Sequence, residues 1–191
     1  MTDWRARKKA ATRRAIQDHA LRLFAAKGYD ATTVEEIAAA AGVSHTTFFR
    51  YFPQKEAVVD YDEYDPLMRR LITERPAAEA PLVALHAAVR DTMATILVTD
   101  RDTMLARIRL ELGTPSLRSR LWIAAGDTRE LFARALAHRA GHTEPDLAAT
   151  AQAGAALAAN GAALAAWAGG ADEDLPGLLD RAYAAIGVPI C

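Results

Sequence analysis

The sequence lacks the features on which secreted and disulfide-stabilised proteins depend. Its single cysteine, Cys191, is the last of 191 residues, so no disulfide can form within the chain. A chain without disulfides suits a reducing compartment. The basic N-terminus is not followed by the apolar segment of a secretory signal. We therefore expect a cytoplasmic protein.

The usual catalytic and metal-binding motifs are also missing. The five histidines form no HExxH pattern, and the sequence contains no GxSxG, GxGxxG or Walker-type phosphate loop. His138 and His142 are four residues apart, but a glycine at an expected helix end lies between them. We therefore expect no metal, no cofactor and no enzymatic activity. Convergent acid–base residues in a pocket would instead favour an enzyme.

Strand signals are scarce, because β-branched runs are short and no alternating apolar pattern precedes a hairpin turn. Alanine and leucine dominate, and proline and glycine separate the segments. We expect a soluble all-α protein of about nine helices. The expected helices span about residues 4–27, 33–42, 44–51, 55–73 (with a kink or break at Pro66), 81–99, 102–112, 115–140, 145–168 and 175–186.

The alanine-rich segment 147–168 could be mistaken for a membrane span, but it contains polar side chains and alanine is only weakly hydrophobic. Glycines and leucines recur in it at seven-residue intervals, which places small and large residues on one stripe of a helix. This stripe could pack within the chain, or it could form a dimer interface. We expect the interface, with residues Gly154, Leu157, Gly161, Leu164 and Ala168.

The charges are unevenly distributed along the chain. Residues 1–55 hold 10 Lys or Arg and 5 Asp or Glu, whereas residues 56–191 hold 13 and 19. A basic segment on an acidic body favours contact with a polyanion such as DNA. A chance imbalance on a solvated surface is the other explanation.

The segment "AGVSHTTFFRYFPQKE", residues 41–56, combines a polar run with four aromatic residues. Before it, Thr33 and Glu36 form the pattern of a capping box, which predicts a short helix that ends at Gly42. Ser44 is expected to cap a second short helix, and Pro53 to end it. Two short helices joined by a glycine turn predict a helix-turn-helix over about residues 32–51, whose second helix enters the major groove.

The aromatic residues of this segment divide by position. Phe48 and Phe52 are four residues apart and share a helix face, so we expect them to pack inward on Phe24 and Ile37. The polar first turn faces outward, where its short side chains can contact bases and phosphates.

The sequence resembles the TetR family of transcriptional regulators over about residues 9–69. The resemblance rests on the spacing of its brace helix, turn and second helix. The matching residues are Phe24, Gly28, Tyr29, Thr32, Thr33, Val34, Ile37, Ala38, Ala41, Gly42, Val43, Ser44, Phe48, Phe52, Lys55 and Glu56. It implies a DNA-binding domain at 1–54 and a ligand-binding and dimerisation domain at 55–191.

The resemblance also implies roles for single residues. Phe49 stands where the family usually has a tyrosine that contacts phosphate, Tyr51 lies near the DNA backbone, and Lys55 points at phosphate. Arg50 either contacts phosphate or is solvated, and the basic N-terminal run is expected to act as an arm that follows phosphates or the minor groove. The expected DNA contacts are Thr33, Ser44, His45, Thr46, Thr47, Phe49, Arg50, Tyr51, Lys55, Arg5, Arg7, Lys8 and Lys9.

An effector pocket is expected between the middle helices. Arg107 either pairs with an acidic group of the ligand or with Glu111 one turn away. The C-terminal half is similar to the mycofactocin-system regulators of the family, which suggests an acyl-thioester or lipid-like effector. The candidate lining residues are Met68, Leu71, His86, Met93, Leu97, Met104, Arg107, Ile108, Trp122, Ile123 and Phe132.

Together these features predict a ligand-responsive repressor that binds a near-palindromic operator as a homodimer, without contact to a membrane. Two alternatives remain open. One is a DNA-binding regulator that has a closed C-terminal core and responds to a partner protein. The other is an enzyme with an added helix-turn-helix.

Overall fold

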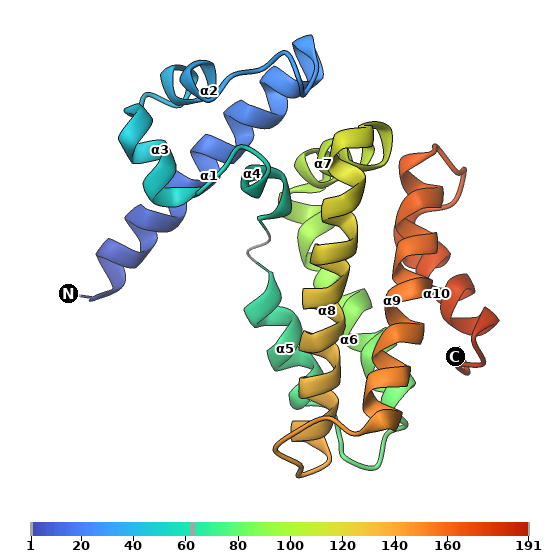
Figure 1. The fold of residues 1–191 in the computed structure, drawn as a ribbon. Coiled ribbons are helices and arrows are strands. Elements are labelled where there is room, and N and C mark those ends of the chain that lie inside the picture. The colour runs from blue at the N-terminus through green and yellow to red at the C-terminus, as the bar shows by residue number, and fades with distance from the viewer. Residues whose placement is uncertain (1, 62–63, 191) are drawn as a thin grey trace. The chain divides into compact units, whose positions relative to one another are not determined.

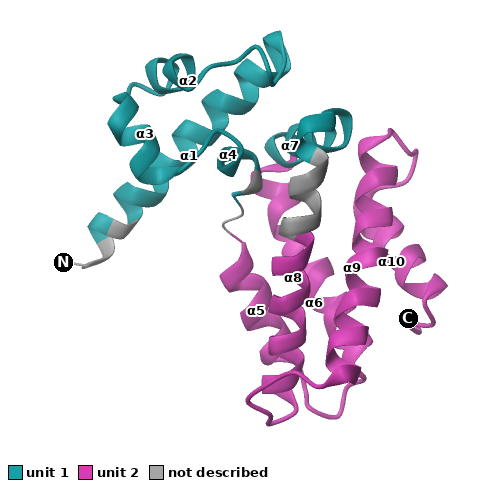
Figure 2. Ribbon diagram, in the orientation of Figure 1, with its two compact units in different colours: residues 1–61, 102–118 teal, residues 62–101, 119–191 magenta. Residues whose placement is uncertain are grey.

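The structure is a computed structural model that describes the backbone of residues 2–61 and 64–190, with side chains described except at residues 2, 3, 6, 60 and 118–124. Within these ranges the chain forms ten α-helices, one short 3-10 helix and no strand (Figure 1). The expected all-α class is confirmed. The chain divides into two compact units (Figure 2): unit 1 comprises residues 1–61 and 102–118, and unit 2 comprises residues 62–101 and 119–191. The domain boundary expected at residues 54 and 55 stays a prediction.

Unit 1 is built around one aromatic and aliphatic core. Helix α1 contacts both α2 and α4, and α2 contacts α3. The side chains of Ile16, Ile37 and Phe48 are fully buried, and those of Phe24 and Phe52 almost fully. Burying this apolar surface stabilises three helices that are too short to be stable alone. The elements of unit 1 are α1 (Thr2–Lys27), α2 (Val34–Ala40), α3 (His45–Tyr51), α4 (Ala57–Asp60), α7 (Arg101–Gly113) and the 3-10 helix η1 (Pro115–Leu117).

The turn between α2 and α3 is a Schellman motif. Gly42 has φ +66°, a left-handed conformation that residues with a Cβ adopt only at a cost. Its N–H donates to the carbonyl of Ala39, and the N–H of Val43 donates to that of Ala38 at 2.9 Å. These two bonds satisfy the end of α2 and set the direction in which α3 leaves it.

The segment over 55–73 is broken, as expected, but the break does not lie at Pro66. Tyr61 is extended, and α5 (Asp65–Thr73) starts anew with Pro66 in its first turn. The basic N-terminal residues are part of α1, which begins at Thr2, close to the helix start expected at about residue 4; their role as an arm on the DNA stays a prediction. Alanines between the charged residues favour this helix.

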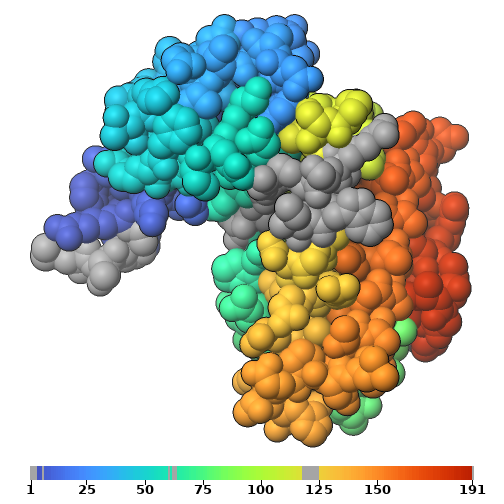
Figure 3. Space-filling model, in the orientation of Figure 1, coloured from blue at the N-terminus to red at the C-terminus, as the bar shows by residue number. Residues whose placement is uncertain are grey.

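Unit 2 is a helical bundle. Helix α6 contacts α5, α9 and α10, and α9 contacts α10. Its core includes Leu85, Phe132, Leu179 and Tyr183, while much of α9 lies at the surface of the unit in Figure 3. By length and composition α6 could cross a membrane, but core helices of soluble proteins pass the same test, and Leu85 on α6 is fully buried in the bundle. Besides α5, its helices are α6 (Pro81–Thr99), α8 (Arg118–Arg139), α9 (Leu147–Ala168) and α10 (Leu175–Ala185).

Candidate nucleic-acid interface

The first turn of α3 presents short polar side chains to solvent. Ser44 caps the helix, since its Oγ accepts a hydrogen bond from the backbone N–H of Thr47 at 3.1 Å and donates one to the Thr47 hydroxyl at 2.9 Å. Ser44, His45 and Thr46 are exposed. The cap confirms the predicted start of α3 and fixes the backbone on which His45 and Thr46 are presented.

The aromatic residues of α3 divide as the sequence predicts. Phe48 and Phe52 lie in the core with their ring centroids 5.9 Å apart. Phe49 is 40% exposed, and its ring meets those of His45 at 4.8 Å and Phe48 at 5.3 Å in edge-to-face contacts. The ring of Phe49 is therefore held in one place on the outer face of the helix.

His45 is also held by a carboxylate of the brace helix. Its Nε2 lies 3.3 Å from Oε1 of Glu35, which is on α2. A backbone hydrogen bond lowers the pKa of the Glu35 carboxyl, and contacts with Thr33 and His45 contribute smaller decreases. The His45 ring is thus oriented from one side by the carboxylate and from the other by Phe49.

The loop before α2 is held by the side chain of Glu36, which accepts from the Thr33 backbone and pairs with Lys27. Thr33 and Glu36 form the predicted capping box, with the backbone N–H of Thr33 2.8 Å from Glu36 Oε2. Lys27 pairs with Glu36, and this contact, followed by the bond from Thr33, lowers the pKa of the Glu36 carboxyl. Thr33 is exposed, so its side chain is at the surface expected to meet the DNA backbone.

Lys55 has structural contacts that the sequence did not indicate. Its Nζ donates to the carbonyls of Tyr29 at 2.9 Å and Thr32 at 3.0 Å, and lies 4.2 Å from the centroid of the Tyr29 ring. The ammonium group therefore ties the chain after α3 to the loop before α2. A phosphate contact by Lys55 stays a prediction.

Arg13 is a second residue whose role the sequence did not indicate. Its guanidinium donates to the carbonyl of Tyr51 at 3.2 Å and lies over the rings of Phe52 and Tyr61 at 5.6 and 4.7 Å. Arg13 thereby joins α1 to the end of α3. In the sequence Arg13 belongs to a basic run, which favoured a solvated or DNA-contacting role. Its contacts with the two aromatic rings arise only in the folded chain, because those rings are distant in the sequence.

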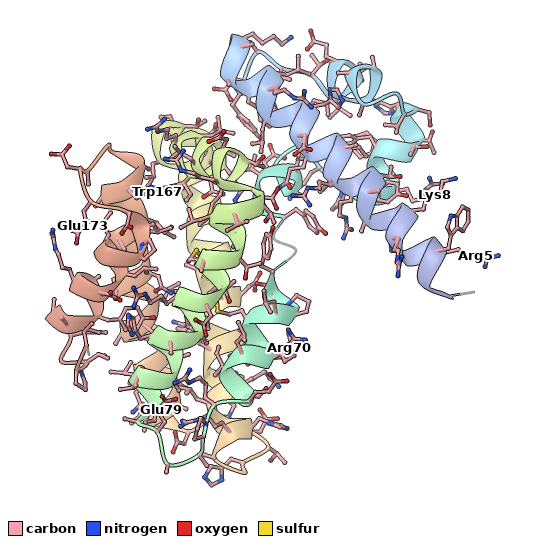
Figure 4. All side chains as sticks on the ribbon, turned by 180° about the vertical axis from the view of Figure 1, so that it is seen from behind. Arg5, Lys8, Arg70, Glu79, Trp167 and Glu173 are labelled. Carbon is pink, nitrogen blue, oxygen red and sulfur yellow. The ribbon has the colours of Figure 1, made fainter. Side chains whose placement is uncertain are left out.

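A basic groove lies between the start of α1 and the end of α3. It encloses about 340 Å³ and is lined by Trp4, Arg5, Lys8, Lys9, Arg50 and Tyr51. Arg5 and Lys8 project from the N-terminal end of α1 in Figure 4. The guanidinium of Arg50 lies 5.4 Å from the ring of Tyr51. The fold thus brings two expected contact regions, residues 5–9 and 50–51, to one surface, and Arg7 lies exposed on the same helix.

Comparison with known sequences identifies the family. Residues 16–61 match the family described as bacterial regulatory proteins, tetR family, and residues 79–189 match the MftR C-terminal domain. The chain belongs to the TetR family. In this TetR-family chain the first match contains the whole of α2 and α3, and the second contains α6 to α10.

Curated relatives and solved structures agree with this assignment. The regulator TcmR of Streptomyces glaucescens is 34% identical over 144 residues, which is 72% of this chain and 64% of TcmR. The mycofactocin biosynthesis transcriptional regulator MftR of Mycobacterium tuberculosis is 28% identical over 73% of this chain and 71% of MftR. FadR of Thermus thermophilus is a TetR-family repressor solved with lauroyl-CoA. It aligns with this chain at a TM-score of 0.59 and 26% identity, and the alignment covers 94% of this chain and 96% of the FadR chain. A TetR-family regulator of Syntrophomonas wolfei shares the fold, with a TM-score of 0.67 at 19% identity over 95% of this chain and 98% of its own.

The residues expected to line an effector pocket fall in both units. Met104, Arg107 and Ile108 belong to unit 1, where Arg107 donates to the carbonyl of Tyr61 at 2.8 Å. The other described candidates belong to unit 2, and Trp122 and Ile123 lie outside the described side chains. The unit 2 candidates are Met68, Leu71, His86, Met93, Leu97 and Phe132.

His86 has a defined environment within unit 2. Its Nε2 lies 2.8 Å from Oδ1 of Asp180, whose other oxygen lies 3.4 Å from Arg90. The His86 ring also contacts that of Tyr183 at 4.8 Å. Burial raises the pKa of the Tyr183 hydroxyl. His86 therefore links α6 to α10, and an effector that used its Nε2 would have to compete with Asp180.

The residues expected at a dimer interface lie on α9 beside its core-facing stripe. Gly161 is exposed, and Gly154, Leu157 and Leu164 are half-buried, whereas Ala168 is buried within the chain. The helix packs its other side on α6 and α10 through alanines such as Ala153, Ala156 and Ala163. Of the expected interface residues, Gly161 is thus the one that is exposed in the single chain.

Proposed function

We propose that the protein is a DNA-binding transcriptional regulator that contacts the major groove of its operator with α3. The observation that carries this proposal is the exposed polar first turn of α3, which a buried aromatic side and the brace helix α2 hold in a fixed orientation. A fixed orientation matters because base contacts are specific only when donors and acceptors are accurately placed. The residues of that turn are Ser44, His45, Thr46 and Thr47.

Different residues would supply specificity and affinity. His45, Thr46 and the Phe49 ring would contact base edges, the last through a thymine methyl group. The basic groove and Thr33 would contact phosphates, and these contacts set the register and the salt dependence of binding without selecting a sequence. The Tyr51 hydroxyl is the phosphate donor that takes the place of the hydroxyl absent from Phe49.

The regulator would act as a homodimer in the cytoplasm. The stripe of Gly154, Leu157, Gly161 and Leu164 on α9 and the neighbouring α10 would pack against the same helices of a second copy, where glycines allow close approach of two backbones. A two-fold dimer presents its two α3 helices about 34–36 Å apart, one DNA turn, so the operator would be near-palindromic.

The effector would be a small apolar or lipid-like molecule, such as an acyl thioester, bound in unit 2. One finding supports this class of ligand: FadR of Thermus thermophilus, which is 26% identical, was solved with lauroyl-CoA. Binding would favour a dimer whose α3 helices no longer fit two successive grooves, which describes a repressor released by its ligand.

Fluorescence anisotropy with DNA from upstream of its own gene tests the proposal. We expect salt-dependent binding that selects one near-palindromic sequence, and loss of that selection in a His45→Ala, Thr46→Ala double variant. An Asp127→Ala variant, altered at an exposed position of α8 outside the helices proposed for the dimer, is the control. Binding of equal strength to every duplex would contradict sequence-specific regulation.

A further inference from the structure

Unit 2 contains a second basic feature, a cavity of about 780 Å³ between α5 and the C-terminal part of α8. We call it the α5–α8 cavity. Three arginines, Arg69, Arg70 and Arg134, and two histidines, His138 and His142, line it. Its volume is within the range of small-molecule sites.

The residues that line this cavity include three arginines and no acidic side chain. Arg69 and Arg70 are exposed, and neither has an ion pair among the described residues. Arg134 does have carboxylate partners, Glu130 on its own helix and Glu144 at 3.7 Å. Two guanidinium groups are therefore available for an anion at this site.

The histidines are held in place by the end of α8. Gly141 has φ +80°, and this turn brings the N–H of His142 to the carbonyl of Ala137 at 2.9 Å. The chain therefore folds back over the last turn of α8, where His138 also lies. The left-handed conformation at Gly141 thus places His138 and His142 on the same cavity.

The α5 side of the cavity is tied to α8 as well. Arg139 donates to the carbonyls of Pro76 and Glu79, in the loop that follows α5, and to that of Arg75 at 3.3 Å. Arg75 in turn pairs with Glu79 across the loop, which lowers the pKa of the Glu79 carboxyl. A preformed site of this kind loses less conformational entropy when a ligand binds.

The floor of the cavity is apolar. Leu131 and Ala135 are buried there, and Pro66 lies at the first turn of α5. Figure 4 shows Arg70 on α5, the helix that forms one wall. Thr73 donates its hydroxyl proton to the Arg69 and Arg70 carbonyls, so the arginines, the histidines and the Thr143 hydroxyl remain the donors for a ligand.

We propose that the α5–α8 cavity binds a phosphorylated small molecule. Arg69 and Arg70 would hold a di- or triphosphate group, His138 and His142 would donate to its outer oxygens, and the organic part would lie on the apolar floor. Guanidinium groups suit phosphate oxygens because their N–H donors form paired hydrogen bonds. This site goes beyond the proposed regulation of transcription, since none of the residues that line it is among the candidates for the effector pocket.

Isothermal titration calorimetry with the full chain at low salt tests the proposal with four probes: pyrophosphate, ADP, ATP and coenzyme A. We expect at least one probe to bind at submillimolar concentration. Arg70→Gln should weaken its binding about tenfold, which corresponds to about 1.4 kcal/mol for one charged hydrogen-bonding group. Arg129→Gln is the matched control, because Arg129 is exposed on α8 and does not line the cavity. Its effect should be below about twofold, as for a distant screened charge.

The probes also distinguish the part of the ligand that is recognised. Equal affinity for pyrophosphate and ATP would support recognition of the phosphates alone, and tighter binding of ATP or coenzyme A would support contact with the apolar floor. Absence of binding by all four probes at millimolar concentration would overturn the proposal. Equal weakening by Arg70→Gln and Arg129→Gln would also overturn it, because it indicates general attraction to positive charge. Arg69→Gln provides a second cavity variant should Arg70→Gln not fold.

Discussion

Replacing Lys55 with methionine separates two roles for this residue. The family resemblance implies that Lys55 contacts phosphate, whereas in the structure its Nζ donates to the Tyr29 and Thr32 carbonyls and lies over the Tyr29 ring. Methionine keeps the apolar stem and removes the ammonium group. We expect the structural role to dominate, so that Lys55→Met lowers stability and weakens DNA binding by loosening the loop before α2.

The size of the effect follows from these contacts. A hydrogen bond from a charged donor contributes about 1.5–3 kcal/mol and an exposed cation–π contact about 0.5–1 kcal/mol. Lys55 is half-buried, so water can reach the two carbonyls in the variant and recover part of this energy. We expect a net loss of about 2 kcal/mol, which lowers the melting temperature of a chain of this size by about 4–8 °C.

Thermal melts and DNA titrations at several salt concentrations distinguish the two roles. A lost phosphate contact decreases the salt slope of log K by about one, whereas a loosened loop leaves it unchanged. Lys8→Met is the control, because Lys8 is exposed in the basic groove and should change the slope without changing the melt. An unchanged melting temperature with a smaller slope for Lys55→Met would refute the structural role.

Variants at three further positions test other parts of the account. Glu36→Gln keeps an acceptor for the Thr33 N–H but loses the pair with Lys27. The pKa of Glu36 is lowered in the folded protein, so the wild type should be more stable than the variant above about pH 4.5. This difference in stability should disappear as the pH falls through the lowered pKa, and thermal melts at a series of pH values would detect it. Tyr183 has a buried hydroxyl without a hydrogen-bond partner among the described residues, so Tyr183→Phe should change stability by less than about 1 kcal/mol and Tyr183→Ala should cost about 3–5 kcal/mol in urea unfolding. Its raised pKa also predicts that the wild type loses stability relative to Tyr183→Phe above about pH 10, and equal pH profiles would contradict this. Gly161→Ala places a methyl group in open space on α9 of the single chain and should stabilise a monomer by up to about 1 kcal/mol. In a close-packed dimer the same methyl group should lower the fraction of dimer measured by light scattering. An unchanged dimer fraction would argue against close packing at Gly161.

The sequence predicted those features of unit 1 that depend on local chemistry. Ser44 caps α3, Gly42 makes the turn, and Phe48 and Phe52 lie in the core, because caps, left-handed glycines and helical spacing act within a few residues. The break after α4 was also expected at Pro66, although the proline begins the next helix instead of ending the last.

The contacts that the sequence did not predict join residues far apart in the chain. Lys55 meets the Tyr29 carbonyl across 26 positions, and Arg13 meets that of Tyr51 across 38. A basic residue has the same local pattern whether it binds phosphate or a carbonyl, so only the fold distinguishes these roles. The α5–α8 cavity is a similar case, since its arginines and histidines come from separate helices.

The most direct test of the central claim is the ratio of operator to non-specific DNA affinity for the wild type and for the His45→Ala, Thr46→Ala variant. The operator is first selected from random duplexes with the wild-type protein. We predict a wild-type ratio of at least about 10³ and a ratio reduced about tenfold or more in the variant, with an unchanged melting temperature. A ratio that is the same in both proteins would show that the first turn of α3 does not determine the DNA sequence bound, and would contradict the account.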